Sequence, residues 1–356
     1  MGCGSGLRNL AVALPMLACG CTAAHERAMT AHHPLPSPLV IAHRGASGER
    51  PEHTLMAYRL AIAEGADVIE PDLVPTKDGV LVARHENNIA ETTDIAAHPE
   101  FAARRTTKVI DGETQTGWFT EDFTLAELKT LRAKERLPML RPGNTNYDGQ
   151  EPIPTFAEVI ALAKQASAET GRTIGIYPET KHPTYFRAIG LPLEDTLLAG
   201  LREAGWDGAA APVFIQSFEV ANLRALAGRT KVPLIQLMTG EGGPADAAEP
   251  SYAAMATAEG MAKIAGYAWG IGVNKDWVAK DPDLVARAHA AGLKVHLWTF
   301  RAENYFLGKP FKRGIDPRAH GDIRGEIDAA LMLGVDGAFS DFPLELRRAV
   351  DARRDE

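Results

Sequence analysis

The sequence predicts an α/β fold, a TIM-type (β/α)8 barrel that is slightly irregular and carries an inserted subdomain. Short apolar runs alternate with helical patterns from Pro38 onward, and this repeated order is typical of a parallel sheet. Several runs contain almost no polar residues, as strands covered on both faces do. Polar side chains follow the ends of several runs, where barrel enzymes form their active sites.

Nine segments have the pattern of strands, one more than an eight-stranded barrel needs. They span residues 39–43, 67–74, 80–85, 173–178, 213–217, 233–238, 270–274, 294–299 and 337–340. The excess lies within residues 67–85, because Lys77-Asp78-Gly79 is a turn signal that joins two strands without a helix. We therefore expect a hairpin at this point in an otherwise parallel barrel.

Helices are predicted between most of these strands. Residues 54–63 form one helix that ends at Gly65, and residues 282–291 form another that ends at Gly292. Thr155 and Glu158 have the spacing of a capping box, which places a helix start there.

Residues 88–152 interrupt the alternation of strands and helices. The segment is rich in polar residues and contains a capped helix start at Thr124–Glu127. It is too long for an ordinary barrel loop, so we interpret it as an inserted subdomain. The barrel domain as a whole is placed at residues 38–350, and the sequence does not indicate its oligomeric state.

The N-terminus has the features of an export signal. Arg8 precedes an apolar stretch at residues 10–18 that is too short to span a bilayer. All three cysteines lie in the first 21 residues, and the surroundings of Cys19 and Cys21 both resemble a bacterial lipoprotein processing site. We predict a signal peptide at residues 1–21, of the lipoprotein type, and a tether at residues 22–37, with simple secretion as the alternative.

A signal peptide of the lipoprotein type predicts a protein in the periplasm or on the outer membrane, in contact with a membrane only through an N-terminal lipid anchor. The net charge is −8 and the chain has no long basic run, which argues against a nucleic-acid partner. A small phosphorylated substrate needs only a local positive site and is compatible with this charge.

Three carboxylates are candidate metal ligands. Glu70 and Asp72 are two residues apart on one predicted strand, so they point to the same side. Two carboxylates this close raise each other's pKa unless a cation lies between them. With Glu179 they form an all-oxygen set that favours Ca²⁺, Mg²⁺ or Mn²⁺ over zinc. A solvated edge strand is the alternative, and the apolar neighbours of this pair oppose it.

Two histidines and two cations complete the candidate site. His43 and His85 each end an apolar run, and a pair of imidazoles suits proton transfer near neutral pH, one as base and one as acid. Arg44 and Lys181 follow strand ends and suit the neutralisation of a phosphodiester.

Eight short motifs follow one another along the chain. They are His43-Arg44-Gly45-Ala46-Ser47-Gly48, Pro51-Glu52-His53-Thr54, Gly65-Ala66-Asp67-Val68-Ile69-Glu70 with Asp72, Thr76-Lys77-Asp78-Gly79 with His85, Gly175-Ile176-Tyr177-Pro178-Glu179 with Lys181, Ile215-Gln216-Ser217-Phe218, Gly270-Ile271-Gly272 and Phe339-Ser340-Asp341-Phe342-Pro343. The ordered set resembles the glycerophosphodiester phosphodiesterase family, closest to its larger periplasmic type, over nearly the whole chain after the tether.

The resemblance implies a barrel with an insertion after the second histidine, and one divalent cation, Ca²⁺ or Mg²⁺, on Glu70, Asp72 and Glu179. It implies that His43 and His85 are the acid–base pair. A glycerophosphodiester would be hydrolysed through a cyclic phosphate to glycerol 3-phosphate and an alcohol. One departure is Glu86, where the family usually has Asp. The run from residue 300 to residue 323 matches no familiar pattern.

Weaker candidates lie at other strand ends. Gln216 is expected to bind phosphate or to order Glu179, and Trp298 to stack on the substrate, although a packing role is an equal alternative for each. His296 shares a strand face with Trp298 and is expected to line the pocket. Glu52 and His53 are interpreted as caps of the first helix. The remaining histidines are interpreted as surface residues: His32, His33, His98, His182, His289 and His320.

Two other functions remain open. One keeps the fold and acts on membrane lipid, as a phospholipase D-like or phosphoinositide-type lyase. It would be expected to show a hydrophobic entry loop, for which Tyr305-Phe306-Leu307 and Phe311 are the only candidates. The other is a non-catalytic surface lipoprotein that binds a partner, and the intact set of histidines and carboxylates opposes it.

Overall fold

The computed structural model describes residues 1–2 and 35–354, so the predicted signal peptide after residue 2 and most of the tether lie outside the described residues. The core is a sheet whose strands are β1 (Leu39–His43), β2 (Val68–Glu70), β3 (Asp72–Pro75), β4 (Leu81–Ala83), β7 (Gly175–Ile176), β8 (Glu179–Thr180), β9 (Ile215–Ser217), β10 (Leu234–Met238), β11 (Gly270–Asn274), β12 (Lys294–Phe300) and β13 (Gly337–Ser340).

Two of the barrel strands are each divided into two short pieces. Pro71 separates β2 from β3, and Tyr177-Pro178 separates β7 from β8, since proline cannot donate to the strand ladder. The first pieces of the two strands, β2 and β7, pair in parallel with each other, and so do the second pieces, β3 and β8. Each pair of pieces therefore occupies one strand position in the sheet.

The strand pairings close the sheet into a barrel. Parallel ladders connect β8 to β9, β9 to β10, β10 to β11, β11 to β12, β12 to β13, β13 to β1 and β1 to β2. With the divided strands counted once, eight positions follow one another around the ring in the described part of the chain. This confirms the predicted (β/α)8 barrel.

The strand in excess of the eight barrel positions is β4, which forms the expected hairpin with β3. β4 pairs antiparallel with β3, and the turn between them contains Lys77, Asp78 and Gly79, the last with φ +77°. Leu73 faces Ala83 across this pair, and all seven residues of the two strands are buried. The hairpin places His85 next to the barrel mouth, two residues after β4.

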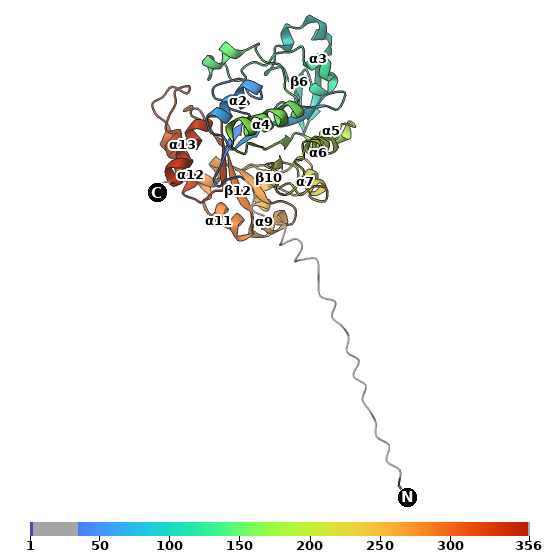
Figure 1. The fold of residues 1–356 in the computed structure, drawn as a ribbon, viewed down its shortest axis with the longest axis vertical. Coiled ribbons are helices and arrows are strands. Elements are labelled where there is room, and N and C mark those ends of the chain that lie inside the picture. Colours follow the sequence, from blue (N-terminus) through green and yellow to red (C-terminus); the bar gives the residue numbers. More distant parts are fainter. Residues whose placement is uncertain (3–34, 355–356) are drawn as a thin grey trace. The chain divides into compact units, whose positions relative to one another are not determined.

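Helices cover the barrel, as Figure 1 shows for α2, α4 and α12. Their bounds are α2 (Leu55–Ala63), α4 (Phe156–Thr170), α5 (Pro183–Ala188), α6 (Leu193–Glu203), α7 (Val220–Ala227), α8 (Tyr252–Met255), α9 (Ala258–Ala265), α10 (Lys275–Lys280), α11 (Asp283–Ala290), α12 (Ile323–Leu331) and α13 (Pro343–Arg354). The capping box predicted at Thr155 and Glu158 is present. Among the described residues, no helix combines the length and apolar character needed to cross a bilayer.

The segment between β4 and α4 holds short elements in place of a single connecting helix. They are η1 (Ile95–Ala97), η2 (Pro99–Arg104), β5 (Thr106–Ile110), β6 (Glu113–Gly117), η3 (Thr120–Asp122), α3 (Leu125–Leu128) and η4 (Pro142–Tyr147). In Figure 1 its β6 and α3 lie at the top, far from α9 and α11 at the bottom. β5 and β6 form a separate antiparallel hairpin, and the capping box at Thr124 and Glu127 is confirmed.

A small aromatic cluster fills the barrel interior beneath the mouth. Tyr177, Phe214 and Phe339 are buried there, and the Tyr177 and Phe214 rings stack with centroids 5.0 Å apart. His296 lies among these rings, with Nδ1 2.7 Å from the Tyr177 hydroxyl, and it does not line the mouth. The expectation that His296 lines the pocket was wrong, because His296 lies two residues before Trp298 on β12, on the same face of the strand but one layer lower in the barrel.

Candidate active site

The predicted site residues converge on one cavity at the carboxyl ends of the strands, the face on which barrel enzymes act. The cavity has a volume of about 100 Å³. It is lined by His43, Arg44, Glu70, His85, Glu179, Lys181, Gln216, Phe218, Leu237, Trp298, Thr299, Arg301 and Phe339. Of the predicted acid–base, metal-binding and substrate-binding residues, all except Asp72 line it directly, and Asp72 lies beside it in register with Glu179.

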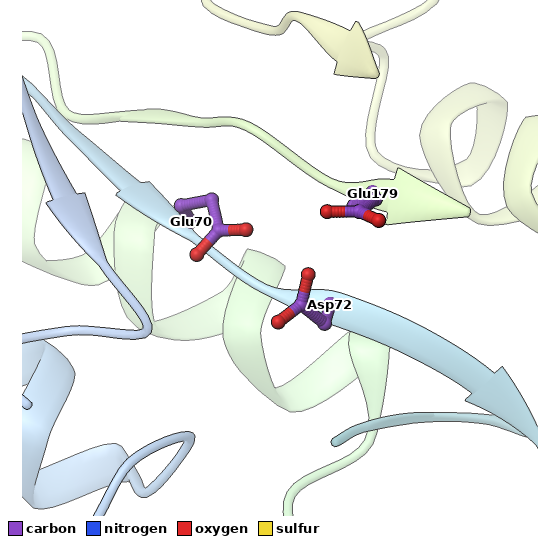
Figure 2. Close-up of side chains that lie close together, drawn as sticks. All are labelled: Glu70, Asp72 and Glu179. Atoms are coloured by element: carbon purple, nitrogen blue, oxygen red, sulfur yellow. The ribbon is translucent and has the colours of Figure 1, made fainter. Parts of the chain in front are cut away.

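The three carboxylates meet because their strands are neighbours in the barrel. Asp72 is aligned with Glu179 across the β3–β8 ladder, while Glu70 lies two residues before Asp72 on the same divided strand. One oxygen from each of the three lies within 4.8 Å of the others, and all three residues are buried. Figure 2 shows the three carboxylates turned toward a common centre.

Three negatively charged carboxylates at this spacing repel one another unless positive charge lies close to them. Burial and the neighbouring Asp72 raise the pKa of Glu70 well above its usual range, and burial raises the pKa of Glu179 to about 8. For Asp72, burial acts in the same sense, but the hydrogen bond to His53 and the charge of Lys181 outweigh it and lower the pKa. Asp72 is therefore an anion, whereas Glu70 and Glu179 take up protons unless a cation joins them.

The donor set fits a hard divalent cation. Oxygen atoms alone converge at the centre, as Ca²⁺ and Mg²⁺ require, with no described cysteine or histidine in the group. The Oδ1 atom of Asp72 is buried and accepts no hydrogen bond from any described residue. A buried carboxylate oxygen without a donor is costly, so a cation ligand is the natural partner for this atom.

His43, the last residue of β1, is fixed by Asp341. Its Nδ1 lies 2.6 Å from Oδ1 of Asp341, which follows β13. Burial and the charge of Arg44, partly opposed by Asp341, lower the pKa of His43 to about 4. The ring is thus a neutral imidazole that donates from Nδ1 to the carboxylate, and Nε2 is left as the atom able to accept a proton.

Asp341 is itself held by two arginines that the sequence did not single out. Arg141 donates to its Oδ2 at 2.6 Å and Arg301 donates to the same atom at 2.9 Å. Arg141 also donates to Glu303 at 2.5 Å. Burial disfavours the charge of Asp341, but Arg301 and Arg141 outweigh it and hold its pKa well below the usual range. The unplaced run from residue 300 to residue 323 thus contributes Arg301 and Glu303 to this network.

His85 is oriented by its sequence neighbour. Its Nδ1 lies 3.0 Å from Oε1 of Glu86, so the glutamate at this position still reaches the imidazole despite its extra methylene. Burial, followed by the charges of Arg44 and Lys181, lowers the pKa of His85 to about 3. The ring is more exposed than that of His43, with 28% of its side chain accessible.

The interpretation of His182 as a free surface residue was wrong. Only 13% of its side chain is exposed, and its two ring nitrogens contact Glu86 and Asp111. Sequence spacing gave no signal for this, because Asp111 lies 71 residues earlier, in the β5–β6 hairpin.

Glu52 and His53 hold the site together, and they do not cap the first helix. Thr54 is the N-cap of α2. His53 contacts Oδ2 of Asp72 at 2.9 Å, and Arg44 donates to Oε2 of Glu52 at 3.1 Å. The interpretation of Glu52 and His53 as caps was therefore wrong, because the cap is Thr54. His53 has a positive φ of 55°, which is uncommon for a residue other than glycine.

Arg44 links the carboxylates to the rim of the cavity. Its φ of 60° directs its backbone N–H to Oε2 of Glu70 at 2.8 Å. Its Nε lies 3.3 Å from Oδ2 of Asp72. Burial opposes its charge, but Glu52, Asp72 and Glu70 outweigh burial and raise the pKa of Arg44, so the guanidinium stays charged beside the cavity.

The remaining candidates also reach the cavity. Lys181 Nζ lies 3.1 Å from Oε1 of Glu179, and Gln216 donates to Oε1 of Glu70 at 3.1 Å. Gln216 therefore orders a carboxylate, although Glu70 and not Glu179. Trp298 lines the cavity with its ring nearly perpendicular to that of Phe218, at a centroid distance of 5.8 Å, and its Nε1 has no hydrogen-bond partner among the described residues.

Comparison with known proteins agrees with this geometry. The model of the glycerophosphoryl diester phosphodiesterase family matches residues 43–345. Glycerophosphodiester phosphodiesterase GDPD6 of Arabidopsis thaliana is 40% identical over 326 residues, which cover 86% of this chain and 84% of the relative. The glycerophosphodiester phosphodiesterase of Haemophilus influenzae is 29% identical over 368 residues, 93% of this chain and 96% of the relative.

Solved structures share the fold. A putative glycerophosphoryl diester phosphodiesterase from Silicibacter pomeroyi has a TM-score of 0.65 at 23% identity, covering 93% of this chain and 98% of its own. An Oleispira antarctica phosphodiesterase, in complex with the product sn-glycerol-3-phosphate, has a TM-score of 0.61 at 21% identity, covering 89% and 97%. From the family match over most of the barrel and the 40% identical relative, the chain belongs to the glycerophosphoryl diester phosphodiesterase family.

Proposed function

We propose that this protein hydrolyses glycerophosphodiesters to sn-glycerol 3-phosphate and an alcohol. The observation that carries the proposal is the presence of two histidines, three carboxylates and two cationic side chains around one cavity of about 100 Å³. The names of the relatives and the product bound to the Oleispira antarctica neighbour support this substrate class.

The first step is an attack by the substrate's own glycerol hydroxyl on phosphorus. The 2-hydroxyl oxygen forms a bond to phosphorus while one histidine of the pair takes its proton at Nε2. The bond from phosphorus to the head-group oxygen breaks, and this oxygen takes a proton from the other histidine. The products of this step are a cyclic glycerol phosphate and the free alcohol.

Water opens the cyclic phosphate in the second step, and the histidines exchange roles. The histidine that gave its proton now accepts one from water, and the other returns its proton to the departing 2-hydroxyl oxygen. Arg44 and Lys181 lower the pKa of His85 before substrate enters. A phosphodiester anion offsets their charge, which favours the protonated histidine that the first step needs.

Glu70, Asp72 and Glu179 are proposed to hold one divalent cation, Ca²⁺ or Mg²⁺. When bound, such a cation neutralises charge that develops on phosphate oxygens. The side chains of Arg44 and Lys181 supply further positive charge at the cavity. Gln216 and the backbone N–H of Arg44 fix the two oxygens of Glu70, so the carboxylate is oriented before the cation arrives.

Added cation should stabilise the folded protein, since a ligand that binds only the native state raises the melting temperature. We expect millimolar Ca²⁺ or Mg²⁺ to raise the Tm of metal-free protein and EDTA to reverse the change, as measured by differential scanning fluorimetry. Glu179→Gln should abolish the shift, whereas Glu203→Gln, a matched change at an exposed position on α6, should retain it. An equal shift in both variants would contradict the site.

A head-group panel tests the substrate class. Purified protein is expected to release sn-glycerol 3-phosphate from glycerophosphocholine and glycerophosphoethanolamine in the presence of the cation, and His43→Ala should lower kcat by about 10²–10⁴-fold. The Tm of His43→Ala should change little, and the exposed His320→Ala serves as the matched control with full activity. Faster turnover of lysophosphatidylcholine would favour the lipid lyase, and no turnover of any ester would favour the non-catalytic alternative.

A leaving group that needs no proton separates the two histidines. The p-nitrophenyl ester of glycerophosphate releases p-nitrophenolate, a stable anion that needs no proton, so loss of the general acid should cost little with this ester. In the first turnover, before the histidines exchange roles, we expect one of His43→Ala and His85→Ala to release p-nitrophenolate much faster than it releases choline from glycerophosphocholine. The other should remain impaired in the first turnover of both esters. Equal recovery, or recovery of neither, would contradict division of the pair into one acid and one base.

For its location, we propose export and a lipid anchor at Cys19 or Cys21, on the basis of the processing pattern around them. Cells that express the full chain should incorporate a labelled fatty acid into the protein. Replacement of one of these cysteines by Ser should remove the label and the other replacement should not. An unlabelled protein recovered from the periplasm would instead favour simple secretion.

A further inference from the structure

The tip of the β5–β6 hairpin reaches toward the active site from the segment between β4 and α4. Asp111 and Gly112 form the two-residue turn, with φ values of 49° and 86°, as a tight hairpin of the I′ type requires. The turn places Oδ2 of Asp111 2.5 Å from Nδ1 of His182. His182 precedes α5 with φ 47° and lies three residues after Glu179 on the chain.

A continuous chain of contacts leads from this hairpin to His85. The Nε2 atom of His182 lies 2.9 Å from Oε2 of Glu86, and Oε1 of the same carboxylate lies 3.0 Å from Nδ1 of His85. The chain is therefore Asp111–His182–Glu86–His85, with the two histidines on either side of one glutamate.

The geometry requires both nitrogens of His182 to donate. Each faces a carboxylate oxygen, and a neutral imidazole would turn a lone pair toward one of the two anions. Burial opposes the positive charge, but the hydrogen bonds to Asp111 and Glu86 outweigh it and raise the pKa of His182 to about 9. With both nitrogens occupied, His182 has no donor left for a substrate phosphate.

The cationic His182 in turn fixes Glu86 as an anion. Burial disfavours that charge, but hydrogen bonds from His182 and His85 outweigh it and lower the pKa of Glu86. An anionic Glu86 accepts the Nδ1–H of His85, which selects one tautomer and leaves Nε2 of His85 for proton exchange. A freely rotating Glu86 would hold neither the tautomer nor the ring angle.

We propose that Asp111 and His182 are positioning residues for catalysis, acting through Glu86 to hold His85 in the tautomer and orientation that proton transfer needs. The β5–β6 hairpin then contributes to the active site from outside the barrel. This inference rests on the proposed function, because it assigns His85 a role in proton transfer.

Two variants of His182 distinguish its contact with Glu86 from its contact with Asp111. His182→Gln extends an amide N–H to about the place of Nε2 and keeps a donor for Glu86, whereas His182→Asn keeps a donor only for Asp111. We expect His182→Asn to lower kcat on glycerophosphocholine by about 10–100-fold. His182→Gln should lower kcat less, with KM and the cation concentration for half-maximal activity unchanged in both variants. A merely structural role for His182 predicts no such order.

Asp111→Asn tests the contact farthest from His85, since Asn tolerates the positive φ of the turn while removing the charge. It should lower kcat, and the double variant Asp111→Asn/His182→Asn should be no slower than His182→Asn alone, because both act through one carboxylate. The control is Glu113→Gln, which also removes one negative charge but at an exposed position of the same hairpin, and it should retain full kcat.

The outcomes separate this proposal from the proposed function. If the unaltered protein hydrolyses no glycerophosphodiester, the proposed function fails first. If the unaltered protein is active and folded His182→Asn keeps its full kcat, only the positioning role is overturned. Equal losses in His182→Gln and His182→Asn, or losses that multiply in the double variant, would also overturn it. Should His182→Asn fail to fold, Asp111→Asn takes its place, and full kcat in folded Asp111→Asn would overturn the positioning role.

Discussion

The mutual repulsion of three buried carboxylates is the constraint around which the site is built. The barrel brings Glu70, Asp72 and Glu179 together by aligning neighbouring strands, and burial makes their charge costly. Cationic or donor groups surround them: Arg44, Lys181, His53 and Gln216 each bond or face one of the three. These groups fix the carboxylate oxygens but leave Oδ1 of Asp72 without a donor, which is the feature that favours a bound cation.

The two histidines have parallel supports from separate parts of the chain. Asp341 fixes His43 and is held by Arg141 and Arg301, whereas Glu86 fixes His85 and contacts His182. The segment between β4 and α4 reaches both supports, since it provides Arg141 to one and Asp111, through His182, to the other. We therefore expect a change in this segment to alter catalysis without touching the substrate.

The site residues at or next to strand ends could be predicted because local sequence specifies them. His43, Glu70, Asp72, His85 and Glu179 stand next to apolar runs, and their motifs occur in a recognisable order. Apart from Glu86, which adjoins His85 in the sequence, the supports could not be predicted, because they are contacts between distant segments. Arg141 lies 200 residues from Asp341, and their pairing depends on how the segment before α4 folds over the barrel. The expectation for His296 failed for a related reason, since alternation along a strand identifies a face but not a layer.

The most direct test of the central claim is the position of a bound cation. Crystals soaked in Mn²⁺, which is visible by anomalous scattering, should show one strong peak bonded to an oxygen of each of Glu70, Asp72 and Glu179, with Oδ1 of Asp72 among its ligands. Absence of a peak among these carboxylates at saturating Mn²⁺, or a peak bound elsewhere at the cavity, would contradict the account.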